Sequence, residues 1–410
     1  MSSDYDLLIS GGGLVGASLA CALAVQNLHI GVVEALPLAV TSQPGYDDRS
    51  LALAYGTRLI FESLGVWESL APVATPILKI HISERGRLGF ARLDRHEEGV
   101  EALGYVVEAR VLGEVLAARL LRLENVTLLC PASLEEFSTD SDTVRVTLRL
   151  AEGTVELGTK LLVAADGARS LIRRQLGIDA IEWDYGQTAI IANLTPEYPH
   201  ENVAYERFTD SGPLALLPMS QGRCAVVYTV DNADADRLLH LDDGAFLTLL
   251  QTRFGERLGR FLRIGRRQAY PLRLIKAREH VRPRVALIGN AAHTLHPVAA
   301  QGFNVGIRDV AALAEVVADA CQAGRDIGKL AVLEQYADWR RWDQRRAVAF
   351  TDGLARLFTN PLLIPARNLG LLAFDLFPPA KHALARQAMG LDGRLPRLAR
   401  GLPLVSRKAL

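Results

Sequence analysis

Residues 5–16 read Y-D-L-L-I-S-G-G-G-L-V-G, which predicts a strand that ends in a glycine turn and passes into a helix. Gly11, Gly13 and Gly16 have G-x-G-x-x-G spacing, which allows a tight turn, an approaching phosphate and close packing of helix on strand. Glu34 ends the next strand, 18 residues after Gly16, where a carboxylate can accept hydrogen bonds from ribose hydroxyls. Together these features predict a βαβ unit that binds a dinucleotide, although the glycines alone would also fit an ordinary turn.

The composition predicts a globular protein, because 49% of the 410 residues are hydrophobic and can form a sizeable core. Lys plus Arg equals Asp plus Glu at 46 each, so no overall charge favours a nucleic-acid partner. The four cysteines are scattered, and the N-terminus has neither the basic nor the apolar region of a leader peptide. We therefore expect a cytoplasmic protein.

The middle of the chain predicts two kinds of structure. Residues 51–64 have helical periodicity, residues 77–83 and 88–93 flank a hairpin turn, and residues 161–165 form a buried strand that ends at Asp166. The β-rich runs that follow predict a separate antiparallel sheet, which we expect to cover the substrate; they are residues 183–194, 202–208, 214–218 and 224–230.

A second loop rich in small residues follows the strand predicted at residues 284–289 and leads into a helix from about Asn304 to Cys321. The N-terminus of such a helix could stabilise negative charge on a reduced flavin. His293 and His296 suggest a metal, but Pro297 breaks the segment and no third ligand stands nearby, so no metal is expected. His293 is expected to anchor the turn by hydrogen bonding.

Two arginines and the basic tail each allow two interpretations. Arg49 and Arg110 precede predicted helices, where they could reach a phosphate or a flavin edge, or could be surface residues of a first helical turn. The tail, residues 381–410, has seven Lys or Arg against the single acid Asp392. It could rest on an anionic membrane or an acidic partner, or it could cap the body of the protein.

Three separated motifs then line up as G-G-G-L-V-G with Glu34, A-D-G-A-R-S-L-I-R at residues 165–173, and G-N-A-A-H-T-L-H-P at residues 289–297. In this combination the chain resembles the class A flavoprotein aromatic hydroxylases over nearly its whole length. Within that class, residues 47–53, 206–219 and 301–309 resemble the ubiquinone-biosynthesis hydroxylases, most of all those that act on 2-polyprenyl-6-methoxyphenol.

The resemblance implies the fold of p-hydroxybenzoate hydroxylase, which is an α/β fold with a Rossmann-like FAD-binding domain, an inserted antiparallel substrate sheet and C-terminal helices. The implied boundaries are FAD-binding parts at 1–76, 104–180 and 276–325, a substrate-domain hairpin at 77–103, a β-rich substrate domain at 181–275, and a helical region with the tail at 326–410.

The resemblance also implies which residues bind FAD. The glycine turn would hold the pyrophosphate, Glu34 the adenosine ribose, and Asn290 the ribityl chain, while Ser170 and Arg173 would support the turn after Asp166. The implied set is Gly11, Gly12, Gly13, Leu14, Val15, Gly16, Glu34, Arg49, Arg110, Leu134, Asp166, Gly167, Asn290, Pro297, Gly302, Phe303 and Asn304.

Two positions depart from the family pattern: Asn290 stands where Asp is usual, and Ala300 where Gly is frequent. An amide oxygen still accepts a hydrogen bond from a ribityl hydroxyl, but it adds no negative charge. We therefore expect FAD to bind, with an altered affinity or potential.

The resemblance implies a monooxygenase that uses NAD(P)H and O₂, through a flavin C4a-hydroperoxide, to hydroxylate a polyprenylated methoxyphenol in ubiquinone biosynthesis. Because the flavin supplies the chemistry, no catalytic side chain is expected, and Pro297 and Gln301 would only support the flavin loop. Other ubiquinone-biosynthesis proteins and the membrane surface are expected contacts. The alternatives are a flavin hydroxylase of a small aromatic acid, with a cation in its pocket, and a non-enzymatic flavin-bearing quinone sensor or scaffold.

Overall fold

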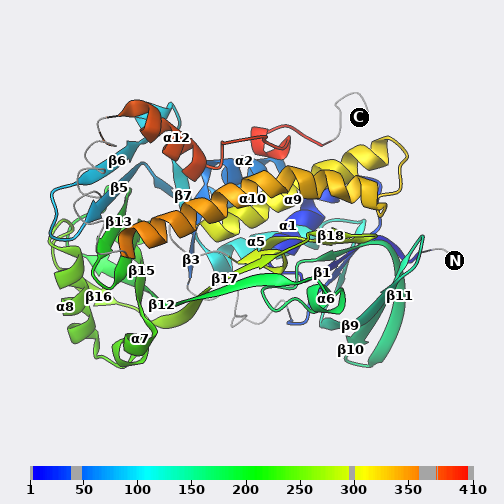
Figure 1. Cartoon of the computed structure of the whole chain (residues 1–410), viewed down its shortest axis with the longest axis horizontal. Coiled ribbons are helices and arrows are strands. Elements are labelled where there is room, and N and C mark those ends of the chain that lie inside the picture. Colours follow the sequence, from blue (N-terminus) through cyan, green and yellow to red (C-terminus); the bar gives the residue numbers. More distant parts are fainter. Residues whose placement is uncertain (1–2, 38–48, 295–300, 360–374, 376, 405–410) are drawn as a thin grey trace.

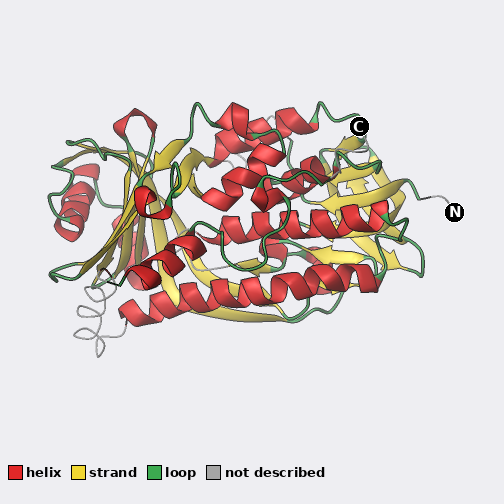
Figure 2. Cartoon of the chain, turned by 90° about the horizontal axis from the view of Figure 1, so that it is seen from above, coloured by secondary structure: helices red, strands yellow, loops and turns green. Residues whose placement is uncertain are grey.

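The computed structural model describes residues 3–37, 49–294, 301–359, 375 and 377–404, with side chains left out for residues 347–359. Figure 1 shows two large sheets at opposite ends of the molecule. Seen from above, the long helices run between these sheets (Figure 2). None of the described helices has the length and apolarity needed to cross a bilayer.

The first sheet has a parallel centre built around the glycine turn. Its parallel strands lie in the order β19 (Val285–Leu287), β11 (Gly153–Ala164), β1 (Tyr5–Ser10), β2 (Ile30–Val33) and β8 (Val126–Leu129). The antiparallel strands β18 (Val281–Arg282), β9 (Ala132–Thr139) and β10 (Val144–Leu150) extend it. Because β1 lies between β11 and β2, the turn after β1 lies beside the ends of both neighbours.

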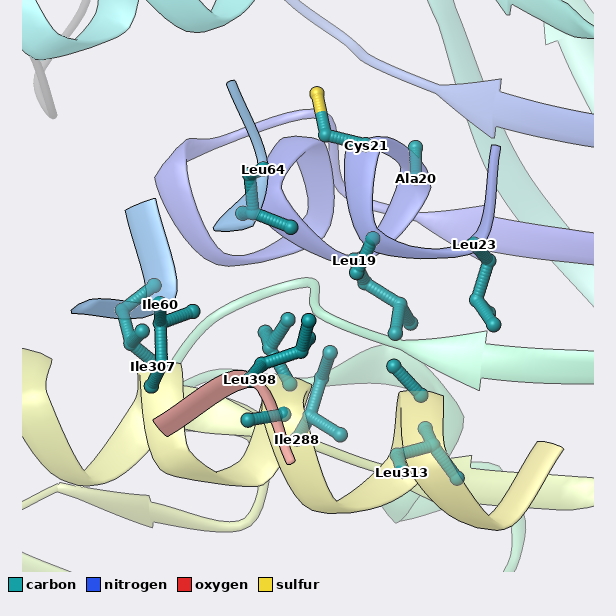
Figure 3. Close-up of a cluster of buried hydrophobic side chains, with 14 of the residues drawn as sticks. Leu19, Ala20, Cys21, Leu23, Ile60, Leu64, Ile288, Ile307, Leu313 and Leu398 are labelled. Carbon is teal, nitrogen blue, oxygen red and sulfur yellow. The ribbon is translucent and has the colours of Figure 1, made fainter. Parts of the chain in front are cut away.

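Helices cover this sheet with an apolar core. The helix α1 (Leu14–Leu23) packs against α9 (Gln301–Gln322) and α5 (Ala109–Leu120), and α9 packs against α10 (Leu330–Thr359). Figure 3 shows Leu19 and Leu23 of α1 facing Leu313 of α9 across this core. The shorter helices are α2 (Tyr55–Ser63), α3 (Trp67–Leu70), α4 (Arg95–Glu98), α6 (Leu171–Gln175), α12 (Pro378–Ala388) and the 3₁₀ turns η1 (Ser220–Gly222), η2 (Gly289–Ala291) and η5 (Leu398–Arg400).

The second sheet is antiparallel except where β13 and β5 run parallel. Its order is β20 (His293–Thr294), β17 (Gln268–Ala277), β12 (Ala180–Pro196), β15 (Cys224–Asp231), β14 (Gly212–Pro218), β13 (Val203–Thr209), β5 (Lys79–Glu84) and β6 (Phe90–Asp94), with β16 (Phe261–Ile264) on β12. The helices α7 (Asn232–Leu239) and α8 (Asp243–Phe254) close its outer face with a separate apolar core.

A third, small sheet lies between the other two and consists of β3 (Ser50–Ala54), β7 (Gly104–Glu108) and β4 (Thr75–Ile77), all antiparallel. The helical prediction for residues 51–64 was wrong at its start, because residues 51–54 form β3 and the helix α2 begins at Tyr55. Pairing of β3 with β7 supplies backbone hydrogen bonds that local periodicity cannot reveal.

Other predicted elements agree with the structure. The hairpin of β5 and β6 and the antiparallel runs after residue 180 are present, so the predicted α/β fold with an inserted antiparallel sheet is confirmed. The long helix α9 starts at Gln301 instead of Asn304, and β11 begins at Gly153, well before the strand predicted at residues 161–165.

Candidate active site

The glycine turn serves packing at two positions and leaves space at the third. A Cβ on Gly11, where φ is 104°, would lie 2.4 Å from the carbonyl oxygen of Ala165, and one on Gly16 would lie 1.9 Å from the carbonyl oxygen of Gly11. A Cβ on Gly13 would meet no atom within 4 Å. Gly11 and Gly16 are therefore required by the fold, whereas the surface at Gly13 is open to a ligand.

Polar groups suited to a dinucleotide surround this open surface. Gly13 caps α1 without a side-chain hydrogen bond, so the first amides of the helix, at Leu14 and Val15, are not capped by a side chain. The Glu34 carboxylate accepts hydrogen bonds from the amides of Gly12 and Leu36, both at 2.9 Å, which fixes it beside the turn.

Asp166 lies at the end of β11, on the other side of the turn. Its Oδ2 accepts a hydrogen bond from the amide of Leu171 at 2.8 Å, and its buried Oδ1 has no partner among the described atoms. Gly167 follows with φ 83°, and a Cβ there would meet nothing within 4 Å. A buried acceptor without a partner is costly, so a donor such as a ligand hydroxyl is expected at this oxygen.

Arg173 ties this turn to the second small-residue loop. It donates hydrogen bonds to the carbonyl oxygens of Ala291 and Ala168, both at 2.8 Å, while Ser170 caps α6 by accepting from the Arg173 amide at 3.0 Å. Both residues therefore support the turn, as expected, and the sequence motifs at 165–173 and 289–297 meet here.

The second loop places Asn290 in η2 with its side chain exposed. At the start of α9, Gln301 donates to the carbonyl oxygen of Ala388 at 3.3 Å, and Phe303 lies with its ring centroid 6.3 Å from that of Phe61. Gly302 is partly exposed between them. Pro297 and Ala300 lie outside the described residues.

The Asn304 side chain makes hydrogen bonds within the protein. Its Oδ1 accepts from the Ala54 amide and the Thr57 hydroxyl, both at 2.8 Å, and its Nδ2 donates to the carbonyl oxygen of Ala52 at 2.9 Å. Asn304 thus joins the start of α9 to β3 and α2, and any role toward a flavin ring falls to its backbone.

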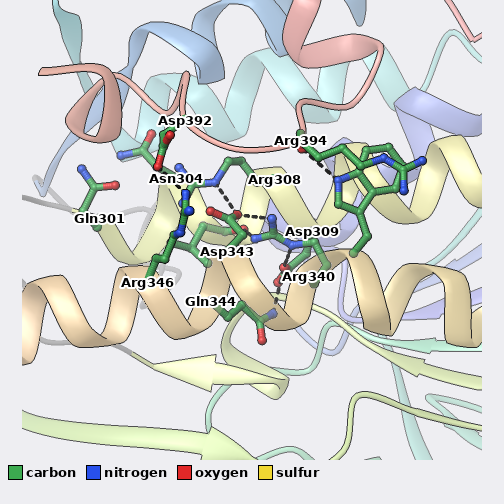
Figure 4. Close-up of polar contacts among 12 residues, drawn as sticks. Gln301, Asn304, Arg308, Asp309, Arg340, Asp343, Gln344, Arg346, Asp392 and Arg394 are labelled. Atoms are coloured by element: carbon green, nitrogen blue, oxygen red, sulfur yellow. Dashed lines mark hydrogen bonds and ion pairs between the residues drawn. The ribbon is translucent and has the colours of Figure 1, made fainter. Parts of the chain in front are cut away.

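A buried ionic network behind this loop was missed from the sequence. The Oδ2 of Asp309 accepts from the amide of Gly289 at 3.0 Å and contacts Nε2 of His293 at 2.6 Å. Its Oδ1 accepts from Arg340 at 2.7 Å and Gln344 at 3.1 Å (Figure 4). Burial alone would raise the pKa of Asp309, but the charges and hydrogen bonds of His293 and Arg340 hold that pKa well below its usual range.

This network was hard to predict because Arg340 and Gln344 come from α10. The local signal in α9 is weak, because Asp309 is one of three acids on this helix, with Glu315 and Asp319. His293 does anchor the loop by hydrogen bonding, as expected. No group of three or more potential metal ligands occurs in the described ranges.

The three remaining residues predicted to bind FAD are Arg49, Arg110 and Leu134, and they lie in different places. The backbone of Arg49 accepts from Ala109 at 2.8 Å, and its guanidinium lies 4.9 Å from the ring centroid of Tyr270, so it faces the second sheet. Arg110 starts α5 and pairs with Glu114 at 2.7 Å and with Glu108. Leu134 is buried in an apolar cluster beside β2 and contributes packing with its side chain.

The second sheet turns one face toward this site, and we call it the inner face. It is defined by Ala204, Leu217 and Ala225, which pack in one cluster with Ile77 of β4 and Val106 of β7. The alternate residues point outward into the core under α7 and α8.

The inner face is partly accessible, and it is acidic on the strands far from β17, whereas at β17 the Arg49 guanidinium lies over Tyr270. Ile82, Ala215 and Val227 are half-buried, whereas the outward residues beside them are buried. On β6, β5, β13 and β14, the charged residues in register with this face are Glu84 and Glu206. The cations of these four strands, Lys79, Arg92 and Arg207, are in register with the outward face, so the described inner face of these strands offers none to a substrate carboxylate.

The chain matches the model of a family described as an FAD binding domain over residues 4–351. It is 39% identical to the ubiquinone hydroxylase UbiL of Rhodospirillum rubrum over 97% of this chain and 93% of that protein. It is 31% identical to the human mitochondrial ubiquinone biosynthesis monooxygenase COQ6 over 93% of this chain and 91% of that protein.

Among solved structures, the fold is similar to that of p-nitrophenol 4-monooxygenase PnpA of Pseudomonas putida. The TM-score is 0.80, and the match covers 96% of this chain and all of that chain at 20% identity. At this identity the likeness establishes the fold alone.

Proposed function

Because the chain belongs to the family of flavoproteins that carry this FAD binding domain, we propose that it is the FAD-dependent monooxygenase that hydroxylates a polyprenylated methoxyphenol in ubiquinone biosynthesis. The relatives named ubiquinone hydroxylase and ubiquinone biosynthesis monooxygenase support this substrate class. The reductant is NAD(P)H and the oxidant is O₂.

The observation that carries the substrate assignment is the inner face of the second sheet. A benzoate-like substrate would need a cation to neutralise its carboxylate in a half-buried site. The charged residues on the strands β6, β5, β13 and β14 of that face are acids, surrounded by aliphatic side chains. This favours a neutral phenol with apolar substituents over an aromatic acid.

The residues around the glycine turn fit FAD. The open surface at Gly13 and the uncapped start of α1 would hold the pyrophosphate, and Glu34 the adenosine ribose. The unpartnered oxygen of Asp166 and the exposed Asn290 would meet the linking part of the cofactor. When bound, FAD supplies the activation of O₂ and the transfer of one oxygen atom to an aromatic ring.

The test has two parts. The purified chain should carry a yellow chromophore released as FAD, and deletion of its gene should cause one prenylated methoxyphenol precursor to accumulate in lipid extracts analysed by mass spectrometry. Unchanged quinone levels and no accumulating precursor would overturn the proposed substrate. Flavin reduction without any hydroxylated product would instead indicate a sensor or scaffold.

We also propose the domain boundaries given above and a membrane contact through the basic tail. Within the described tail, Arg397 pairs with Glu315 and Asp319, and Arg394 lies 3.9 Å from the ring centroid of Trp339, so these two cations bind the body of the protein. Leu398 and Leu404 are buried. A membrane contact would therefore depend on other cations of the tail. Co-sedimentation with anionic vesicles, compared between the full chain and a chain ending at Leu404, tests this contact.

A further inference from the structure

Glu206 points from the second sheet toward the candidate active site. On β13, Tyr205 faces outward, with its ring centroid 5.3 Å from that of Phe254, while Ala204 packs inward on Ile77 and Val106. The pairing of β13 with β14 and β5 is regular at Glu206, so side chains alternate without interruption. Glu206 therefore shares the inner face with Ala204.

The surroundings of Glu206 leave its carboxylate without a partner. Its direct neighbours across the two adjacent strands are Ile82 and Ala215, which have no polar side-chain atoms. No hydrogen bond or ion pair joins its carboxylate to a described atom, and the side chain is half-buried. Burial raises the pKa of Glu206 to about 7.

The start of α9 is linked through Ala52 to the part of the inner face around Ala204. Ala52 packs with Ala204 and Leu217, and its carbonyl oxygen accepts the hydrogen bond from Asn304 in the first turn of α9. Glu206 lies two residues further along β13 than Ala204, which corresponds to about 7 Å of strand. Glu206 is therefore the next inward-facing residue along β13 from the place where the inner face adjoins β3 and the start of α9.

We propose that Glu206 is the catalytic base that takes the hydroxyl proton of the phenol substrate, an assignment that rests on the proposed function. The phenol O–H bond breaks, a bond forms between that proton and a carboxylate oxygen of Glu206, and the electron pair stays on the phenol oxygen. The negative charge moves from the carboxylate to the ring, so the net charge of the site does not change.

This transfer would assist hydroxylation because the phenolate ring is richer in electrons and accepts an electrophilic oxygen atom more readily. A base works best when its proton affinity is matched to the operating pH, which its burial among Ile82 and Ala215 provides. An apolar setting also suits a prenylated phenol, and the other acid of this face, Glu84, lies opposite Phe208, one inward-facing position further along the sheet.

The experiment compares wild type, E206Q, E206D and the matched control E182Q, each purified with FAD. Glu182 is an exposed acid of β12 in the same sheet. With a short-chain prenylated methoxyphenol, E206Q should lose about a hundredfold or more in hydroxylation rate near pH 7. It should recover at alkaline pH, where the free phenol ionises, and E206D should retain part of the rate. E182Q should match wild type.

A binding measurement separates this role from folding and from the proposed function. A nitro-substituted methoxyphenol, whose phenolate absorbs visible light, should bind to wild type as the phenolate near neutral pH and to E206Q as the neutral phenol. Identical spectra and identical pH–rate profiles for wild type and E206Q would overturn the proposal. A wild type that ionises the bound phenol but hydroxylates no prenylated phenol would overturn the proposed function alone.

Discussion

The molecule buries carboxylates in two regions and treats them in opposite ways. Between α9 and α10, Asp309 is fully buried and contacts four different residues, two of which, His293 and Arg340, hold its pKa below the usual range. On the inner face, the Glu206 carboxylate has no partner among the described atoms, and burial raises its pKa to about 7. The first arrangement fixes a loop, whereas the second leaves a group ready to react with a ligand.

Among the changes to charged residues, the largest effect is expected from the network around Asp309. D309N would remove the buried carboxylate that pairs with both Arg340 and His293 and would leave Arg340 with Asp343 alone, so we expect a loss of about 3–5 kcal/mol in the free energy of unfolding, measured by urea denaturation. The control is D338N, an exposed acid on α10 that pairs with Arg341. If D309N were as stable as D338N, the network would not support the loop.

A smaller effect of opposite sign is expected from E206Q. The folded-state pKa of Glu206, about 7, lies above the ordinary value of 4.5, so ionisation costs folding free energy only above the lower of these values. E206Q should therefore match wild type at pH 4 and become more stable as pH rises to 7, by up to about 3 kcal/mol. Equal stabilisation at both pH values, measured by urea denaturation, would show that Glu206 is not perturbed by burial.

The glycine turn offers a second comparison, between a position with room for a Cβ and a position without it. G13A should fold like wild type, because its Cβ meets no protein atom, yet it should bind FAD about ten to a hundred times more weakly. G16A should fail to fold, because its Cβ would lie 1.9 Å from a carbonyl oxygen. FAD titration and thermal unfolding measure both, and normal FAD binding by G13A would place the pyrophosphate elsewhere.

The smallest effect on stability is expected at Arg110. Its ion pairs with Glu114 and Glu108 are partly exposed, so R110A should change the free energy of unfolding by less than about 1 kcal/mol. If Arg110 contacts the cofactor, as the resemblance implies, FAD affinity should fall severalfold in R110A, and it should not fall in R122A, an exposed control after α5. Equal FAD affinity in both variants would make Arg110 a surface ion pair only.

Features that depend on local sequence could be predicted, whereas features that depend on contacts between distant segments could not. The βαβ unit, the turn after Asp166 and the hairpin of β5 and β6 depend on local spacing, so they were predicted correctly. The strand β3 was not, because its partner β7 lies far along the chain. The sequence did not indicate a role for Asp309, because its partners Arg340 and Gln344 come from another helix.

Glu206 shows a further limit. An acid in the alternating run Val203–Thr209 could have been noticed, but only the register of β13 with β5 and β14 reveals which face it occupies. Strand register is set by long-range packing and changes the face of every side chain when it shifts by one residue. The geometry of a substrate face is therefore the part of this site that needs a structure.

The parallel pairing of β13 with β5 also bears on how the protein is made. Lys79 of β5 lies opposite Val203 of β13. During synthesis β5 therefore cannot pair with β13 until more than a hundred further residues, many of which form the other sheet, have been made. At a ribosomal rate of about 5–20 residues per second, its edge stays open for roughly ten seconds. Such non-local pairing slows folding and exposes apolar edges to aggregation, so production of this enzyme should depend on chaperones, and neither sheet can be expressed as a continuous fragment.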